Sequence, residues 1–157
     1  MTAISNRMDQ LAEKPVATPV ATTVTPVLAQ IGAAGWEHVA GSARKPGGAT
    51  AASGTMSVDL PDGATIQSLR VIGENGGAGV LSIILRRQKL DPTAASEPIV
   101  GVVGSGGPFD NKIAPQDQTR AVVDTDTFRY YVVAQVSNAG AGDTVRVDSF
   151  QIVHIAH

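Results

Sequence analysis

Residues 128–136 read FRYYVVAQV and alternate between two kinds of side chain. The even positions hold aromatic and aliphatic residues, whereas Arg129, Tyr131 and Gln135 lie at odd positions. Because successive side chains of a β-strand point to opposite faces of the sheet, this period of two predicts a strand with one buried face. It is the clearest strand signal in the chain.

Short apolar runs separated by glycine, proline, asparagine and aspartate lie on both sides of this segment. Runs of this kind are typical of all-β proteins. They predict strands over 55–60, 65–72, 79–87, 99–103, 120–123 and 144–155. The glycine-rich residues 104–115 are expected to form a long connection, and no long helix is predicted after residue 30.

The apolar pattern changes parity within residues 144–155. Val145 and Val147 share one parity, but Phe150 and Ile152 have the opposite one. Such a change predicts a β-bulge, or a strand that bends from one sheet into the other. About seven short strands at this spacing predict an antiparallel two-sheet β-sandwich of jelly-roll type.

Residues 1–32 have a different pattern, and we expect them to form an extended N-terminal arm. An apolar pattern of roughly helical spacing before the first proline predicts a short helix. Residues 15–27, PVATPVATTVTPV, favour extended backbone because each proline fixes one backbone dihedral angle. The chain is therefore divided into this arm and a β-sandwich domain over 33–157.

The valines of the arm make it more apolar than a solvated linker needs to be. Disordered segments are usually poor in β-branched residues, so we expect the arm to dock on the body of its own chain or on a neighbour. A disordered tail is the alternative. The candidate docking residues are Ile4, Met8, Leu11, Val16, Val20 and Val24.

The composition excludes several kinds of chemistry. Twelve lysine and arginine residues against fourteen acidic residues give a formal net charge of −2, so no overall positive field attracts nucleic acid or an anionic membrane. The chain has no cysteine, and its three histidines lack the spacing of metal ligands. We therefore expect neither nucleic acid nor a membrane as partner, and no metal or cofactor.

The motifs of common enzymes are missing from the sequence. Residues 101–112, GVVGSGGPFDNK, lack the Gly-Lys-Ser/Thr ending of a phosphate-binding loop, and no Gly-x-Ser-x-Gly elbow is present. Residues 1–11 are not followed by the apolar stretch of a secretion signal. The sequence predicts a protein that is not an enzyme, with no catalytic residues and no secretion signal.

Four residues are candidates for a surface or interface contact: Trp36, Tyr131, Arg86 and Arg87. Sugar-binding β-sandwiches present exposed aromatic side chains, usually two or more, and Tyr131 lies on the more polar parity of its strand. A tryptophan such as Trp36 is more often a core or interface anchor. The two arginines belong to the one basic cluster of the chain, for which a solvated strand end is the alternative to an acidic partner.

Residues 57–87 together with FRYYVVAQVSNAGAGDTVRVDSFQIVH, residues 128–154, resemble the β-sandwich accessory modules of many bacterial and phage proteins. With the apolar arm added, the chain is similar in plan to the decoration or cement proteins of tailed-phage capsids. The resemblance implies a virion structural protein that assembles as a homo-oligomer, expected to be a trimer, and stabilises the lattice of the major capsid protein through its arm. The alternative is a carbohydrate-binding β-sandwich module.

Overall fold

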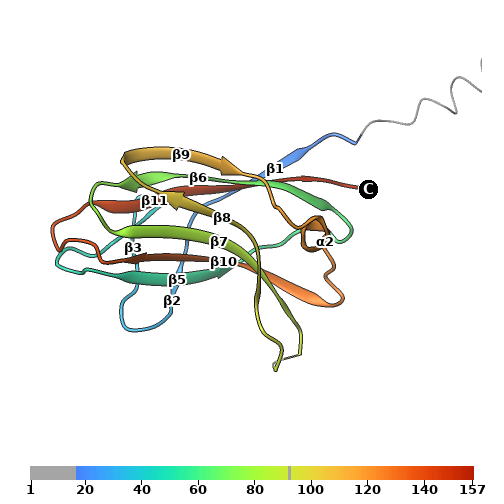
Figure 1. Cartoon of the computed structure of the whole chain (residues 1–157), viewed down its shortest axis with the longest axis horizontal. Coiled ribbons are helices and arrows are strands. Elements are labelled where there is room, and N and C mark those ends of the chain that lie inside the picture. The colour runs from blue at the N-terminus through green and yellow to red at the C-terminus, as the bar shows by residue number, and fades with distance from the viewer. Residues whose placement is uncertain (1–16, 92) are drawn as a thin grey trace, which may run out of the picture.

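The computed structural model describes residues 17–91 and 93–157 of the chain. These residues form two stacked antiparallel sheets, which Figure 1 shows as an upper and a lower layer. Sheet A consists of β1 (Val20–Val24), β3 (Glu37–Val39), β4 (Ser42–Arg44), β6 (Thr65–Asn75), β9 (Gly107–Ile113) and β11 (Val145–Ile155). Sheet B consists of β2 (Ala29–Gln30), β5 (Ala52–Ser57), β7 (Val80–Lys89), β8 (Glu97–Gly104) and β10 (Phe128–Ser137). The predicted all-β, jelly-roll-like two-sheet sandwich is confirmed.

The core lies between the two sheets and is made by alternate residues of the long strands. In β10, Val132, Ala134 and Val136 are fully buried, while the residues between them face the outside of sheet B. From sheet A, Phe150 and Ile152 of β11 reach the same core. The period of two in residues 128–136 therefore predicted the strand and its buried face correctly, because burial of one face imposes that period.

The parity change in β11 is a β-bulge. The register between β11 and β6 shifts between Val147 and Ser149, so that one extra residue lies at Asp148. This residue brings Val147 on one side and Phe150 on the other to the same inner face, and both are fully buried. Of the two predicted explanations, the bulge is correct, and the strand remains in sheet A.

The prediction of a long connection over residues 104–115 is wrong. A tight turn that contains Gly106 with φ +77° joins β8 directly to β9, which covers Gly107–Ile113. This strand lies at the edge of sheet A, where Phe109 is its one buried side chain. An edge strand needs little apolar surface, and this explains why hydrophobic periodicity did not reveal it.

The predicted strand over 120–123 is also wrong at its beginning, because a short helix, α2 (Gln118–Ala121), replaces it. The Oδ1 atom of Asp117 accepts hydrogen bonds from the backbone amides of Thr119 at 2.9 Å and Arg120 at 3.3 Å. Aspartate is a favoured residue at this capping position, since it satisfies amides that have no partner inside the helix. In residues 17–91 and 93–157, no helix is long and apolar enough to cross a membrane.

The sandwich includes residues that the sequence analysis assigned to the arm. Strand β1 pairs with the second half of β11, with Val20 opposite His154 and Val24 opposite Phe150, and β2 pairs with β5. The predicted boundary at residue 33 is therefore corrected, and the body begins by residue 20. For β1, the contact is with the body of its own chain. The predicted helix and the docking residues Ile4, Met8, Leu11 and Val16 lie outside the described residues.

Candidate functional site

A groove with a volume of about 790 Å³ lies on the outer face of sheet B. It is lined by the outward-facing residues of β5, β10 and β7, and by residues of and beside the edge strand β2. We call it the sheet B groove. Its lining consists of Val27, Ala29, Ile31, Thr55, Met56, Ser57, Ile84, Arg86, Gln88, Ser96, Arg129, Tyr131, Val133 and Gln135. Two of the four predicted contact residues, Tyr131 and Arg86, therefore lie together at one site.

The ring of Tyr131 is fixed at both ends. Its backbone belongs to β10, opposite Arg86 of β7, and its hydroxyl donates a hydrogen bond to Oγ of Ser96 at 2.6 Å. Nε of Arg86 donates to the same oxygen at 2.6 Å, and Nη2 of Arg86 donates to the Ser96 carbonyl at 3.3 Å. A hydroxyl oxygen has two lone pairs, so Ser96 can accept both side-chain bonds. The tyrosine ring and the guanidinium are thus held by one serine.

Arg129 extends the polar side of the groove. Its guanidinium carbon lies 5.4 Å from the centre of the Tyr131 ring, within the range of a cation–π contact. Nη2 of Arg129 donates a hydrogen bond to Oε1 of Gln88, whose own amide donates to the carbonyl of Ala94 at 2.9 Å. These bonds fix a second guanidinium and an amide beside the aromatic ring.

Arg87 is not part of this groove, although it follows Arg86 directly. Consecutive residues of a strand point to opposite faces, and Arg87 lies on the inner face, where it is 9% exposed. Its guanidinium lies 3.9 Å from the centre of the Phe128 ring, and its Nη2 is 2.9 Å from Oε2 of Glu97. The structure therefore gives Arg87 a structural role and not the predicted surface contact.

Trp36 is also absent from the groove, because it lies in the core. Its side chain is 6% exposed, and its indole nitrogen donates a hydrogen bond to the carbonyl of Ala134 at 3.0 Å. Gly54 makes room for it, since a Cβ atom there would lie 3.0 Å from Cδ1 of Trp36. The structure therefore shows Trp36 as a core residue. Its ring is not exposed for contact with a sugar.

The docking residues that fall within the described part of the arm lie away from the groove. Val20 and Val24 belong to β1 of sheet A, whereas the groove is on the outer face of sheet B. Val20 is half exposed and Val24 is half-buried. The structure therefore separates the predicted arm contacts from the predicted surface contacts.

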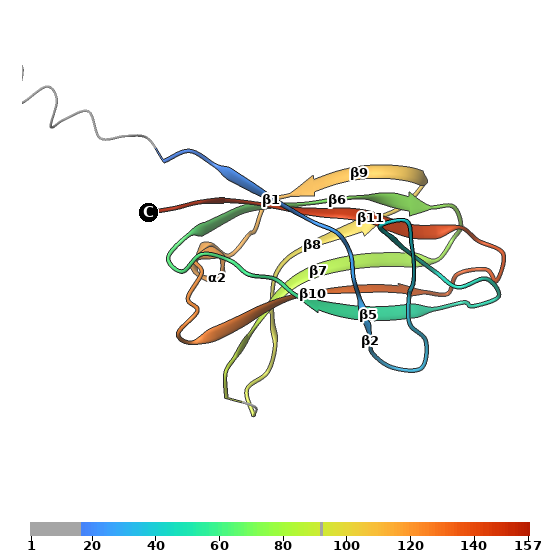
Figure 2. The same cartoon turned by 180° about the vertical axis from the view of Figure 1, so that it is seen from behind.

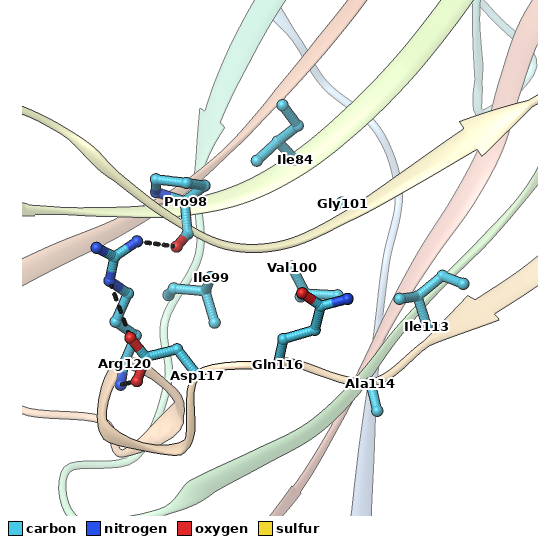
Figure 3. A pocket seen from close by; sticks show the side chains of 10 residues that line it. All are labelled: Ile84, Pro98, Ile99, Val100, Gly101, Ile113, Ala114, Gln116, Asp117 and Arg120. Atoms are coloured by element: carbon cyan, nitrogen blue, oxygen red, sulfur yellow. Dashed lines mark hydrogen bonds and ion pairs between the residues drawn. The ribbon is translucent and has the colours of Figure 1, made fainter.

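A second hollow, with a volume of about 410 Å³, lies beside the edge strand β8 and α2 (Figure 3). Its walls are mainly apolar and include Pro98, Val100 and Ile113. Among the described residues of its lining the one cation is Arg120, which lies 3.5 Å from an oxygen of Asp117 and donates a hydrogen bond to the carbonyl of Pro98 at 3.2 Å. Because these polar groups are already paired with one another, this hollow offers few of them to a ligand.

The outer face of sheet A has a different character from the groove, because several of its arginines are paired with carboxylates. The guanidinium of Arg70 binds both carboxylate oxygens of Asp110, at 2.7 and 2.6 Å, and these hydrogen bonds lower the pKa of the Asp110 carboxyl. Arg146 is likewise paired with Glu74 and Asp148. No group of three or more histidine, aspartate and glutamate side chains in the described ranges is arranged to hold a metal ion.

Of the polar residues that hold the groove in place, Ser96 is one that no sequence pattern marked. It lies just before β8, in the hairpin that projects from the body in both views (Figure 2). No local pattern marks this serine, because its role depends on a contact with a tyrosine 35 positions away. Gln88 could have been found, since it shares the outward parity of Arg86 on β7.

No protein-family model matches this chain. No curated protein matches it either. Among solved structures, it is similar to a family 29 carbohydrate-binding module complexed with cellulohexaose, with 11% identity, a TM-score of 0.42, and 85% of this chain and 91% of that one covered.

It is also similar to the module TmCBM61 in complex with β-1,4-galactotriose, with 14% identity, a TM-score of 0.39, and 85% of this chain and 86% of that one covered. A third similarity is to the infectious bursal disease virus Gx strain structure, with 12% identity, a TM-score of 0.39, and 89% of this chain covered. The chain spans 32% of that viral protein. These likenesses concern the sandwich fold alone.

Proposed function

We propose that this protein is a non-enzymatic binding module that holds a carbohydrate chain in the sheet B groove. The observation that supports this is the ring of Tyr131, which Ser96 fixes in position beside Arg129 and two glutamine side chains. A sugar ring has an apolar face that packs on an aromatic ring, and hydroxyl groups that need hydrogen-bond donors and acceptors. Amides and guanidinium groups next to a tyrosine supply both.

The size and lining of the groove also support binding. Its volume of about 790 Å³ lies within the range of roughly 300–1,000 Å³ that is typical of ligand sites. Of the described residues that line it, none is aspartate, glutamate or histidine. Hydrolysis of a glycosidic bond uses a pair of carboxylic acids, so this lining favours binding over cleavage.

Affinity electrophoresis and calorimetry of the full chain with a broad panel of soluble neutral and acidic polysaccharides test the proposal. We expect binding to at least one of them, and an affinity at least about tenfold weaker, or ~1.4 kcal/mol, in Tyr131→Ala. Tyr131→Phe keeps the ring but loses the hydrogen bond to Ser96, so its affinity should lie between those of wild type and Tyr131→Ala. The matched control is Val39→Ala, at an exposed position on β3.

Thermal unfolding of each variant shows whether it is folded, and Gln135→Ala provides a second test at the exposed rim of the groove. Two results would overturn the proposal. One is a wild-type protein that binds no polysaccharide of the panel. The other is a set of folded Tyr131 and Gln135 variants that all bind as tightly as wild type.

The second candidate function is that of a capsid decoration or cement protein, located in the virion and assembled as a trimer on the major capsid protein. The position of β1 favours it. Because β1 pairs antiparallel with β11, the chain reaches sheet A at the end where β11 stops, as Figure 2 shows. Val20, the first residue of β1, therefore lies at that end of sheet A, away from the face that carries the groove.

Light scattering on a sizing column tests this second candidate. A trimer of the full chain that persists after residues 1–16 are deleted would support an assembly whose arm is free to bind a lattice. A monomer in both forms over a wide concentration range would overturn it, because a single arm lacks the avidity of three linked contacts.

A further inference from the structure

We infer that the ligand of the sheet B groove is an anionic polysaccharide, one that carries carboxylate or sulfate groups; this rests on the proposed carbohydrate-binding function. Among the described residues of the lining, the charged side chains are Arg86 and Arg129. Both are cationic, although the whole chain has a formal net charge of −2. The positive charge of the groove is therefore a local property and not a reflection of the composition.

The two arginines differ from most others in this protein, because no carboxylate in the described residues pairs with them. Arg86 binds Ser96 and Arg129 binds Gln88, and both partners are neutral. Four other arginines lie within ion-pair distance of a carboxylate: Arg70, Arg87, Arg120 and Arg146. The groove thus contains two guanidinium groups whose charge no carboxylate of residues 17–91 and 93–157 compensates.

These guanidinium groups are also held in place before a ligand binds. Ser96 accepts from Nε and Nη2 of Arg86, and Gln88 accepts from Nη2 of Arg129. A planar guanidinium fits a carboxylate or sulfate with two parallel hydrogen bonds, and charge-assisted bonds are roughly twice as strong as neutral ones. Less conformational entropy is lost on binding when the side chain is already fixed.

Both cations can reach the same oligosaccharide. Arg86 lies directly opposite Tyr131 across the β7–β10 pair, and Arg129 lies two residues before Tyr131 on the same face of β10. Strands are about 4.8 Å apart, and two residues along a strand span about 7 Å, so the two guanidinium groups flank one aromatic ring. We expect the ring to contact the sugar while the arginines bind the acidic groups on either side.

Single-stranded nucleic acid offers similar anionic chemistry, but the groove fits it less well. Proteins that bind single strands stack successive bases on several aromatic side chains. The described lining of the groove has one aromatic residue, Tyr131, and two cations, Arg86 and Arg129, whereas a strand of nucleic acid carries a phosphate at every nucleotide. The observations therefore favour an acidic glycan, and an oligonucleotide belongs among the controls of the experiment.

The test uses pairs of polysaccharides that differ chiefly in charge: polygalacturonate and its methyl ester, alginate and its methyl ester, and dextran sulfate and dextran. We expect the full chain to bind at least one acidic form about tenfold or more tightly than its neutral derivative. Raising NaCl from about 50 mM to about 500 mM should weaken that binding, because salt screens exposed charges.

Arg129→Gln and Arg86→Gln should each remove most of this preference. Arg129→Gln is the cleaner variant, because Arg86→Gln also alters the contacts around Ser96. The matched control is Arg44→Gln on β4, which is also without a carboxylate partner among the described residues but lies outside the groove. This control should bind as wild type does.

The outcomes separate this inference from the proposed function. If only neutral polysaccharides bind, or if Arg129→Gln keeps the full preference for acidic ones, the inference is overturned while the carbohydrate-binding function stands. If a single-stranded oligonucleotide binds as tightly as the best acidic glycan, the inference is also overturned. If no polysaccharide binds at all, the proposed function fails and the inference fails with it.

Discussion

Trp36→Phe separates a core role of this residue from a role in ligand binding. The substitution keeps an aromatic ring but removes the indole nitrogen, which donates to the carbonyl of Ala134 at 3.0 Å. A buried polar group that loses its partner costs about 1–3 kcal/mol. The smaller ring adds roughly 1 kcal/mol for the space that it leaves. We therefore expect the free energy of unfolding to fall by about 2–4 kcal/mol.

For a domain of this size, each kcal/mol lowers the midpoint of thermal unfolding by about 2–4 °C, so the expected decrease is roughly 5–15 °C. Circular dichroism in the far ultraviolet measures it, with Val39→Ala as a surface control that should change the stability by less than about 0.5 kcal/mol. Polysaccharide affinity, measured well below the transition, should be unchanged. A midpoint within about 2 °C of wild type, or a folded variant that has lost its affinity, would refute the argument.

Three further substitutions test other parts of the structure. In Gly54→Ala, the new Cβ would lie 2.7 Å from Cβ of Leu28, so we expect β2 to shift and thermal stability to fall by about 1–3 kcal/mol. In Ser68→Ala, a buried hydroxyl that has no hydrogen-bond partner is removed. Thermal unfolding should show a free energy of unfolding that is unchanged or higher by up to about 1 kcal/mol. In Asp110→Asn, we expect the free energy of unfolding, measured by urea unfolding, to fall less than in wild type when the pH is lowered from about 6 to about 3. The reason is that Arg70 lowers the pKa of Asp110 in the folded state, and this contribution is present above the unfolded pKa and lost as the pH falls through the folded one.

The long strands in which every second residue is buried could be predicted from the sequence, because burial of one face between two sheets imposes a period of two. Residues 128–136 and the bulge at Asp148 are the clearest cases. Strand β9 could not be predicted in this way, since an edge strand buries only Phe109. The helix α2 was missed for another reason: its capping residue Asp117 is visible in the sequence, but the apolar residues that follow it favoured a strand.

In the candidate site, features set within one strand could be predicted from the sequence, whereas contacts between strands could not. The outward parity of Tyr131, Arg129 and Gln135 follows from the sequence, because all three lie on one strand. That Tyr131 lies next to Arg86 could not be predicted from the sequence, since it depends on the register between β10 and β7. Arg87 and Trp36 were candidates by residue type, and both point into the body. The position of Trp36 needed the structure, whereas the inward parity of Arg87, which it shares with Leu85, is visible in the sequence.

The central position of β11 in sheet A has a consequence for the order of folding. Strand β11 lies between β6 on one side and both β1 and β4 on the other. Until β11 has been synthesised, β1 has no hydrogen-bonded neighbour, and β4 and β6 each have only one, β3 and β9. During translation, β1, β4 and β6 are all made first, and the edges that pair with β11 remain open until a strand more than 60 residues further along the chain is made. Contacts of such long sequence separation form slowly, and the exposed strand edges invite pairing with other chains. Chaperone dependence during synthesis is therefore the expected cost of placing this strand at the centre of the sheet.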